Sequence, residues 1–226
     1  MIKSLLPSRD EKNTFWDIAF FVISIFLVLL IVGVIIMYSA IRPFDIVGDS
    51  MEPNLHNGNT VIIQKNYPTP VRGDVVVIKT THIDQDGTST QNYIIKRIVA
   101  IEGDKIGFVR AQGHDNIIYF YRDCGQGWEQ VFEPYTKEYM SFGSSSVVFN
   151  KNLFKIYESV DEMKNGGYTV IEKDKFFAMG DNRNVSADSR KYGQFDVSTI
   201  AGKEIFIYEK DSFYDRFFSI FFKNKN

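Results

Sequence analysis

The sequence has few residues of the kinds from which disulfide frameworks, metal sites and nucleic-acid interfaces are built. Its 226 residues include one cysteine, Cys124, so no internal disulfide can form. The three histidines, His56, His82 and His114, lie far apart and in no zinc-binding spacing. The 26 Lys and Arg are outnumbered by 28 Asp and Glu, whereas a general nucleic-acid-binding domain is basic. We therefore expect no disulfide, no metal, no other cofactor and no nucleic-acid partner.

Charged residues are also missing from one long stretch near the N-terminus. Residues 18–37 are apolar throughout, and a helix of that length spans roughly 30 Å, the thickness of the hydrocarbon core of a bilayer. Trp16 and Tyr38 flank the run, as interfacial aromatic residues do. The run is long for a cleaved signal peptide and lacks the polar face of a core helix. We predict a retained transmembrane helix over residues 18–38, preceded by a short N-terminal segment over residues 1–17 that lies outside the bilayer.

The charges that flank this helix predict its orientation. Lys3, Arg9 and Lys12 precede the helix, whereas only Arg42 follows it closely. Basic residues favour the cytoplasmic side of a membrane. The N-terminus is therefore expected in the cytoplasm and the chain from about residue 40 onward outside it. A single cysteine suits an exported domain that is held together by its core.

The rest of the chain predicts a mostly β fold. Short segments rich in Val, Ile, Tyr and Phe alternate with turns rich in Gly, Asn and Asp, which favours a largely antiparallel barrel or sandwich. We expect this domain over 39–106 and 171–210, with an inserted β subdomain over 107–170. The expected strands cover 61–65, 74–79, 93–101, 117–121, 146–149, 168–171 and 203–208.

The C-terminal segment, residues 211–226, has its aromatic residues at helical spacing. They are Phe213, Tyr214, Phe217, Phe218, Phe221 and Phe222. Two interpretations remain open: an amphipathic helix that lies on a membrane surface, or an ordinary helix that packs against the domain.

Three short stretches carry residues suited to catalysis, and the first is 44–55. Ser50 follows Gly48 closely, and Pro53 restricts the turn beyond it. Such a turn can expose a serine hydroxyl and a backbone N–H to the same space. Alone, the stretch is more typical of an ordinary exposed serine than of a nucleophile.

The second stretch, 93–104, contains Lys96 in a predicted strand. Ile94 and Ile98 would share its face of the strand. Burial among apolar side chains lowers the pKa of a lysine, and the neighbouring charge of Arg97 acts in the same direction. A lysine of this kind can serve as a general base. The alternative is an edge-strand lysine whose amine reaches water.

The third stretch, 179–190, holds two Asp, two Arg, two Ser and two Asn directly after an apolar segment. It is either a solvated loop or a buried polar network that orients other groups. None of the three stretches contains a histidine, so they assemble no Ser-His-Asp triad. A serine nucleophile with a lysine base is a known variant of the same chemistry.

Together these stretches resemble the bacterial type I signal peptidases, membrane-anchored serine proteases that remove signal peptides from exported preproteins. The matching motifs are Gly48-x-Ser50-Met51-x-Pro53-x-Leu55, Arg72-Gly73-Asp74-Val75-Val76, Lys96-Arg97-Ile98-Val99-x-x-x-Gly103-Asp104 and Gly180-Asp181-Asn182-Arg183-x-x-Ser186-x-Asp188-Ser189-Arg190. They stand in the family's order behind an apolar helix. The resemblance covers 15–106 and 175–208 well and 107–170 hardly at all.

The resemblance implies a role for each matching residue. Ser50 is expected to be the nucleophile, Lys96 the general base, and Ser186 the residue that orients the Lys96 amine. The Ser50 backbone N–H is expected to stabilise the oxyanion. Gly48 takes the place of a serine that supplies a second donor in some members. Supporting roles are implied for Arg97, Asp181, Asp188 and Arg190.

The resemblance also implies how substrate binds. The signal peptide would lie as an extended strand along 44–48 and 93–96, with small residues at positions −1 and −3 of the cleavage site. The expected pocket walls are Ile46, Met51, Leu55 and Ile95. The implied partners are preprotein signal peptides and the lipid bilayer of the bacterial plasma membrane. Ala100 and Glu102 depart from the family's usual Gly and Pro, which affects only the local turn.

Other interpretations belong to different functional classes. A self-cleaving regulator of the SOS-repressor type would share the β scaffold, but such proteins are soluble, and the apolar helix argues against one. A specialised peptidase of the same family, for example one that matures a pilin, remains open. An inactive anchored scaffold is disfavoured, because Ser50 and Lys96 are both present.

Overall fold

The protein is described by a computed structural model that covers residues 9–83, 89–114, 116–141, 149–150 and 152–222. The chain divides into two compact units, residues 1–41 and 42–226. The described part of the first unit consists of helix α1 (Arg9–Ala40). Its part Thr14–Ala40 is long and apolar enough to cross a membrane, and none of its most apolar window is buried in the protein. The predicted apolar N-terminal helix is confirmed, and its exposure is unlike that of a core helix.

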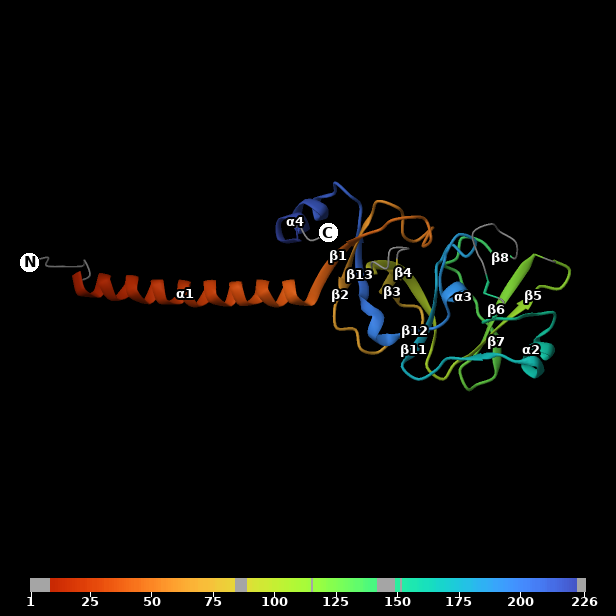
Figure 1. Cartoon of the computed structure of the whole chain (residues 1–226). Helices are drawn as coiled ribbons and strands as arrows, with labels where there is room; N and C mark the ends of the chain where they lie inside the picture. Colours follow the sequence, from red (N-terminus) through yellow and green to blue (C-terminus); the bar gives the residue numbers. More distant parts are fainter. Residues whose placement is uncertain (1–8, 84–88, 115, 142–148, 151, 223–226) are drawn as a thin grey trace, which may run out of the picture. The chain divides into compact units, whose positions relative to one another are not determined.

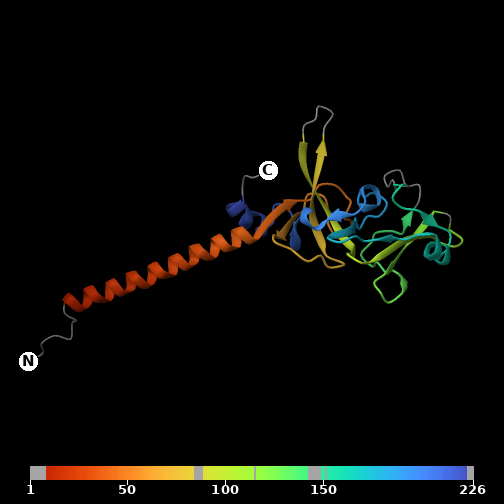
Figure 2. The same ribbon diagram turned by 60° about the horizontal axis from the view of Figure 1, so that its bottom comes forward.

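The second unit is built on two sheets that occupy separate halves of it (Figure 1). The first sheet has seven strands in the order β1-β2-β13-β3-β4-β11-β12. Its strands are β1 (Ile41–Asp45), β2 (Thr60–Gln64), β3 (Val75–Ile83), β4 (Ser89–Ile101), β11 (Lys175–Met179), β12 (Phe195–Asp196) and β13 (Ile200–Tyr208). Strands β3 and β4 form a long hairpin whose far end extends beyond the sheet (Figure 2).

The second sheet lies entirely within residues 105–170. Its main path is β10-β5-β6-β7, with β8 paired to β6 and β9 paired to β5. The bounds are β5 (Lys105–Arg110), β6 (Ile117–Asp123), β7 (Trp128–Gln130), β8 (Met140–Ser141), β9 (Ile156–Tyr157) and β10 (Thr169–Val170). Among the described residues of this sheet, β5 and β9 pair in parallel and the other strand pairs are antiparallel. The prediction of a mostly antiparallel β domain is confirmed.

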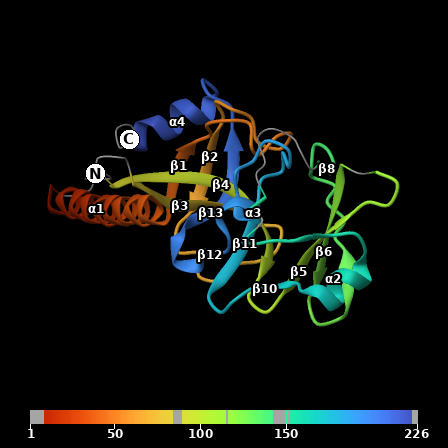
Figure 3. The ribbon, with the colours of Figure 1, turned by 45° about the vertical axis from the view of Figure 1, so that its right-hand side comes forward.

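The two sheets lie side by side (Figure 3), and a shared apolar core joins them. Val99 of β4 and Phe177 of β11 belong to the same buried cluster as Phe108 of β5 and Phe120 of β6. The ring centroids of Phe108 and Phe177 are 6.3 Å apart. Burial of so much aromatic surface fixes the inserted residues against the first sheet.

Four short helical elements complete the second unit. They are α2 (Val160–Gly166), α3 (Ser189–Tyr192), the 3-10 turn η1 (Val197–Thr199) and α4 (Phe213–Phe222). The predicted C-terminal helix packs against β13, since Phe206 lies 5.1 Å from Tyr214 and Tyr208 stacks on Phe218 at 5.7 Å, between ring centroids. The expected strand at 146–149 lies largely outside the described residues, and Phe149 itself belongs to no strand.

The pairing of β4 with β3 and β11 determines which residues lie together at the candidate site. Lys96 is paired in register with Val76 of β3, and Arg97 with Met179 of β11. The loop that follows Met179 therefore begins beside Lys96. Residues more than 80 positions apart in the sequence thus come together at one end of the sheet.

Candidate active site

Ser50 lies in a tight turn after β1, here called the nucleophile turn (residues 49–55). The N–H groups of Asn54 and Leu55 donate to the Met51 carbonyl oxygen, each at 3.1 Å. Met51 and Leu55 are buried in the core, whereas Ser50 is only half-buried. The two apolar side chains anchor the turn and leave the serine at the surface. Gly48 precedes it with a φ of 86°, a conformation that glycine adopts without strain.

Ser50 and Lys96 meet in this structure. Lys96 Nζ lies 2.9 Å from Ser50 Oγ and donates to the Ile95 carbonyl oxygen at 2.7 Å. The lysine side chain is almost fully buried, with 4% of the residue exposed. Both distances are those of ordinary hydrogen bonds. The amine is therefore held against the hydroxyl and shielded from bulk water.

Burial changes the acid–base behaviour of this lysine. Desolvation lowers the pKa of Lys96 from 10.5 to about 8, because the charged form loses its hydration. The charge of Arg190 adds to this lowering, while the carboxylates of Asp188 and Asp181 oppose it. Near neutral pH such an amine can both accept and donate a proton, which is what a general base requires.

The ion pair of Arg97 and Asp181 joins three segments of the site. Arg97 Nε and Nη2 donate to the two carboxylate oxygens of Asp181 at 2.8 and 2.6 Å. Asn54 Nδ2 donates to Asp181 Oδ2 at 2.8 Å. Strand β4, the loop after β11 and the nucleophile turn are thereby tied to one buried carboxylate.

A second buried ion pair shapes the loop after β11. Arg190 Nε and Nη2 donate to Asp188 Oδ1 and Oδ2 at 2.9 and 2.7 Å, and the Gly180 N–H donates to Asp188 Oδ2 at 3.0 Å. Burial alone would raise the pKa of Asp188, but the Arg190 guanidinium, together with the Gly180 N–H and the Ser186 hydroxyl, offsets this effect, and the pKa lies below its ordinary value. The carboxylate thus stays charged and holds the loop closed.

Ser186 is buried, but its hydroxyl does not form the expected hydrogen bond with the Lys96 amine. Its Oγ has no hydrogen-bond partner within the described part of the chain. The hydroxyl contributes to the low pKa of Asp188, although the two groups do not meet hydrogen-bond geometry. A Cβ at Gly180 would clash with Ser186 Oγ and with the Ser50 carbonyl oxygen. Only glycine allows these two segments to approach so closely.

The four residues expected to form pocket walls share one apolar cluster. Ile46, Met51 and Leu55 are buried there, and Ile95 packs against them half-buried. The cluster lies beside the nucleophile turn, to which Met51 and Leu55 themselves belong.

Sequence reasoning did not single out several residues that contact the site. Asn182 donates from its N–H to the Ser50 carbonyl oxygen and from Nδ2 to the Asp49 carbonyl oxygen, both at 3.1 Å. Asn182 and Asn54 stood within the quoted motifs, so their positions could have been noticed. Glu133 and Tyr135, which contact Arg183 and Arg97, lie outside every motif.

Comparisons with known proteins agree on one family. A family model described as "Signal peptidase, peptidase S26" matches residues 18–209. The chain is 28% identical over 208 residues to signal peptidase I of Bacillus licheniformis, across 89% of this chain and 92% of that protein. It is 30% identical over 184 residues to signal peptidase IB of Staphylococcus aureus (strain COL), across 80% of this chain and 82% of that protein. A crystal structure of a signal peptidase I from Enterococcus faecalis V583 matches with a TM-score of 0.33 and 18% identity, over 60% of this chain and 96% of that chain.

Replacing the buried lysine should stabilise the fold at neutral pH. Below pH 8 the amine is charged in the folded and the unfolded chain, so folding bears the full cost of burying the charge; this cost disappears as the pH rises toward 10.5. Lys96→Met should therefore raise the free energy of unfolding by about 3 kcal/mol at pH 7. Unfolding of the full chain in detergent, measured from pH 7 to 10.5, should show this advantage shrinking.

Lys79→Met is the matched control, because Lys79 is exposed on the neighbouring strand β3. It should leave the pH dependence of stability unchanged. An advantage of Lys96→Met that is the same at pH 7 and pH 10.5 would contradict the lowered pKa.

Proposed function

Since the chain belongs to the signal peptidase family of S26 peptidases and removes signal peptides from preproteins, we propose that Ser50 is its nucleophile and Lys96 its general base. The single observation that carries this assignment is the 2.9 Å distance between Ser50 Oγ and Lys96 Nζ. The pKa of about 8 for Lys96 supports it, since a neutral amine is needed to accept the serine proton.

The reaction then proceeds by acyl transfer. The neutral Lys96 amine takes the proton of Ser50 Oγ while this oxygen attacks the carbonyl carbon of the scissile peptide bond. The C–N bond breaks, and the Lys96 ammonium returns the proton to the departing amine. The signal peptide remains bound to Ser50 as an ester. A water molecule, deprotonated by Lys96, hydrolyses that ester and restores the serine.

The Ser50 backbone N–H is assigned to the oxyanion that forms at each tetrahedral stage. The carbonyl oxygen of Ser50 accepts a hydrogen bond from the N–H of Asn182, which limits rotation of the peptide group between Ser50 and Met51. Gly48 offers no side-chain donor, and its φ of 86° is one that a serine would adopt only with strain. The stabilisation therefore depends on backbone donors.

The charged residues around the pair are assigned to positioning. Asp188 and Arg190 hold the loop that carries Ser186, and Arg97 and Asp181 hold the nucleophile turn through Asn54. The Ser186 hydroxyl is buried and unpaired among the described residues, so it is available to orient the Lys96 amine during the reaction.

The substrate is proposed to bind as an extended strand along residues 44–48 and 93–96. The apolar cluster of Ile46, Met51, Leu55 and Ile95 would form the pocket walls. Three of these side chains are almost fully buried, so we expect any pocket that they line to be shallow. Shallow apolar pockets accept small side chains and exclude large ones, which suits small residues at the −1 and −3 positions.

The protein is proposed to reside in the bacterial plasma membrane with its N-terminus in the cytoplasm and its catalytic domain outside. The balance of basic residues around α1 supports this orientation. Exported preproteins carry their cleavage sites to that side of the membrane, and they are the proposed partners.

Helix α4 is proposed to rest on the bilayer surface. Tyr214 and Phe218 contact β13, although Tyr214 is itself 49% exposed, and Phe213, Phe217 and Ile220 lie on an adjoining face of the helix with 75%, 42% and 76% exposure. Residues at positions i, i+4 and i+7 share one helical face. Exposed basic residues near the helix, Lys210 and Arg216, would attract anionic lipid headgroups. On this proposal the helix would both pack against the domain and present an apolar face to the bilayer.

Substitution of the two catalytic residues tests the proposed chemistry. Ser50→Ala and Lys96→Ala should each lower the rate of preprotein cleavage in detergent by about a thousandfold or more, because neither chemical step has a substitute group. Wild type should cut after an Ala-x-Ala-like site. Ser198→Ala and Lys79→Ala, at exposed positions, should retain wild-type rates. Near-full activity of folded Lys96→Ala would show that the base is another residue.

The pH profile should follow the state of the lysine. Because the pKa of Lys96 is lowered to about 8, the amine is neutral above this pH and charged below it. We expect kcat/KM to rise along a limb with an apparent pKa near 8 and to fall about tenfold per pH unit below pH 7. A rate that stays flat down to pH 5 would exclude a lysine base.

Cleavage in a bilayer tests the role of α4. The triple variant Phe213→Ser, Phe217→Ser, Ile220→Ser should cleave a preprotein embedded in anionic vesicles about tenfold more slowly, because its apolar contact with the bilayer is lost. It should cleave a short peptide in detergent at the wild-type rate.

Exposed apolar residues elsewhere provide the control for that variant. The set Val71→Ser, Leu153→Ser, Val170→Ser changes exposed side chains outside α4 and should leave both rates unaltered. Equal slowing of both triple variants in vesicles would remove α4 as a membrane contact.

A further inference from the structure

A segment of the inserted residues reaches the catalytic site. Residues 133–137, here called the clamp segment, lie between β7 and β8 of the second sheet. No catalytic motif extends into them. The segment nevertheless contacts both the loop after β11 and the nucleophile turn.

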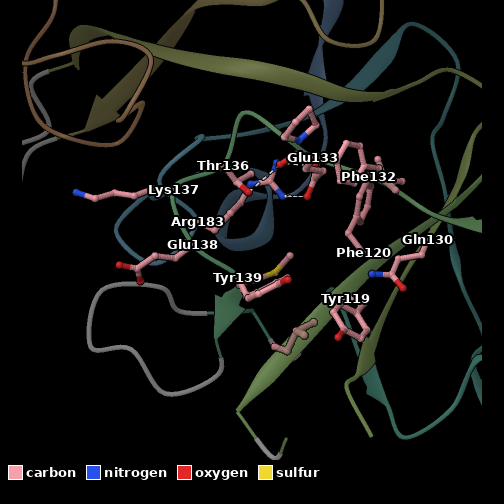
Figure 4. A pocket seen from close by; sticks show the side chains of 14 residues that line it. Tyr119, Phe120, Gln130, Phe132, Glu133, Thr136, Lys137, Glu138, Tyr139 and Arg183 are labelled. Carbon is pink, nitrogen blue, oxygen red and sulfur yellow. Dashed lines mark hydrogen bonds and ion pairs between the residues drawn. The ribbon is translucent and has the colours of Figure 1, made fainter.

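Its first contact is an ion pair with a buried arginine. Glu133 Oε1 accepts from Arg183 Nη2 at 2.6 Å, and its other carboxylate oxygen pairs with Nη1 (Figure 4). Arg183 is 1% exposed, and its Nε donates to the Gly180 carbonyl oxygen at 3.0 Å. Glu133 therefore neutralises the buried guanidinium of Arg183. That guanidinium in turn holds the carbonyl group of Gly180, the residue next to Asp181. An unpaired arginine at this depth would be costly.

The second contact is made by the ring of Tyr135. The guanidinium carbon of Arg97 lies 4.3 Å from the centroid of this ring, well within the range of a cation–π interaction. Arg97 is the partner of Asp181, which in turn accepts from Asn54 of the nucleophile turn. The ring covers the guanidinium and favours the conformation in which Arg97 engages Asp181.

Two further contacts fall directly on the nucleophile turn. Asn54 Nδ2 donates to the Tyr135 carbonyl oxygen at 2.7 Å as well as to Asp181. Lys137 Nζ lies 3.1 Å from Glu52 Oε2. Glu52 and Asn54 follow Ser50 by two and four positions. The clamp segment thus contacts the second half of the turn that carries the serine, while Asn182 holds its first half through the carbonyl oxygens of Asp49 and Ser50.

We propose that Tyr135 is a positioning residue of the reaction: together with the clamp segment, it holds the nucleophile turn so that Ser50 Oγ faces the Lys96 amine. This proposal rests on the proposed catalytic roles of those two residues. Tyr135 touches neither of them in the contacts described, and it acts through Arg97, Asp181 and Asn54. Reaction rates depend steeply on such alignment, whereas the proposed strand contacts with substrate, along 44–48 and 93–96, lie outside the turn.

Variants of Tyr135 in the full chain, assayed in detergent with a preprotein, test this role. Tyr135→Leu keeps the bulk but removes the aromatic face, and it should lower kcat by about tenfold or more while KM changes by less than about threefold. Tyr135→Phe retains the ring over Arg97 and should restore kcat to within about threefold of wild type. If Tyr135 only filled space, Tyr135→Leu and Tyr135→Phe should have similar kcat values, so a higher kcat for Tyr135→Phe would show that the aromatic ring matters.

A matched control separates this effect from general damage to the segment. Phe132 precedes the clamp segment and is 85% exposed, so Phe132→Leu should leave kcat and KM at wild-type values. Thermal unfolding of each variant reports whether the chain is folded at the assay temperature. A folded Tyr135→Leu variant with wild-type kcat would overturn the proposal. So would a Tyr135→Phe variant whose kcat is as low as that of Tyr135→Leu.

A double variant tests the route of the effect. If Tyr135 acts through Asn54, then Tyr135→Leu combined with Asn54→Ala should lower kcat little more than the stronger single change, because both remove the same restraint. Losses that multiply would refute this route. Ser50→Ala in the same assay keeps the two proposals distinct: if it cleaves normally, the catalytic assignment fails whatever Tyr135 does.

Discussion

The site depends on a lysine amine that is kept away from water and beside a serine hydroxyl. A buried amine that met a carboxylate would become a stable ammonium and lose its value as a base. Here the nearby carboxylates are engaged elsewhere, Asp181 by Arg97 and Asp188 by Arg190. Their charges reach Lys96 only through space and cancel in part against Arg190. Desolvation therefore dominates, and the pKa falls toward neutrality.

This arrangement explains why so many charged side chains are buried around the Ser50 hydroxyl and the Lys96 amine. Each carboxylate must form an ion pair with its own guanidinium, because an unpaired carboxylate would stabilise the Lys96 ammonium and raise the pKa of the amine. Buried ion pairs contribute little net stability, because desolvation offsets much of their attraction. The free energy that holds the domain together comes instead from the apolar cluster shared by the two sheets. The charge pairs determine geometry and pKa at the cost of some of that stability.

The sequence singled out Ser50 and Lys96, whose side chains the structure places 2.9 Å apart, because both residues lie in short motifs. Ser50 sits in a Gly- and Pro-bounded turn, Lys96 in a strand, and the polar loop after residue 179 in an unusual cluster. The apolar helix and the mostly β fold followed from composition and periodicity. The expected hydrogen bond from Ser186 to Lys96 is absent in this structure, because the loop packs the hydroxyl against Gly180 instead. Such a shift of one side chain depends on packing that a motif does not encode.

Glu133 and Tyr135 were unpredictable for a different reason. Their partners, Arg183 and Arg97, are 50 and 38 positions away, and no local pattern marks an acid or a tyrosine that will meet them. The contact exists only because the aromatic core joins the second sheet to the first and thereby brings the inserted residues over the nucleophile turn. An insertion that would otherwise be an appendage becomes part of the framework on which the serine is held. If Ser50 and Lys96 act as proposed, its fold is coupled to catalysis through packing, and a change in that core should alter the rate without touching either residue.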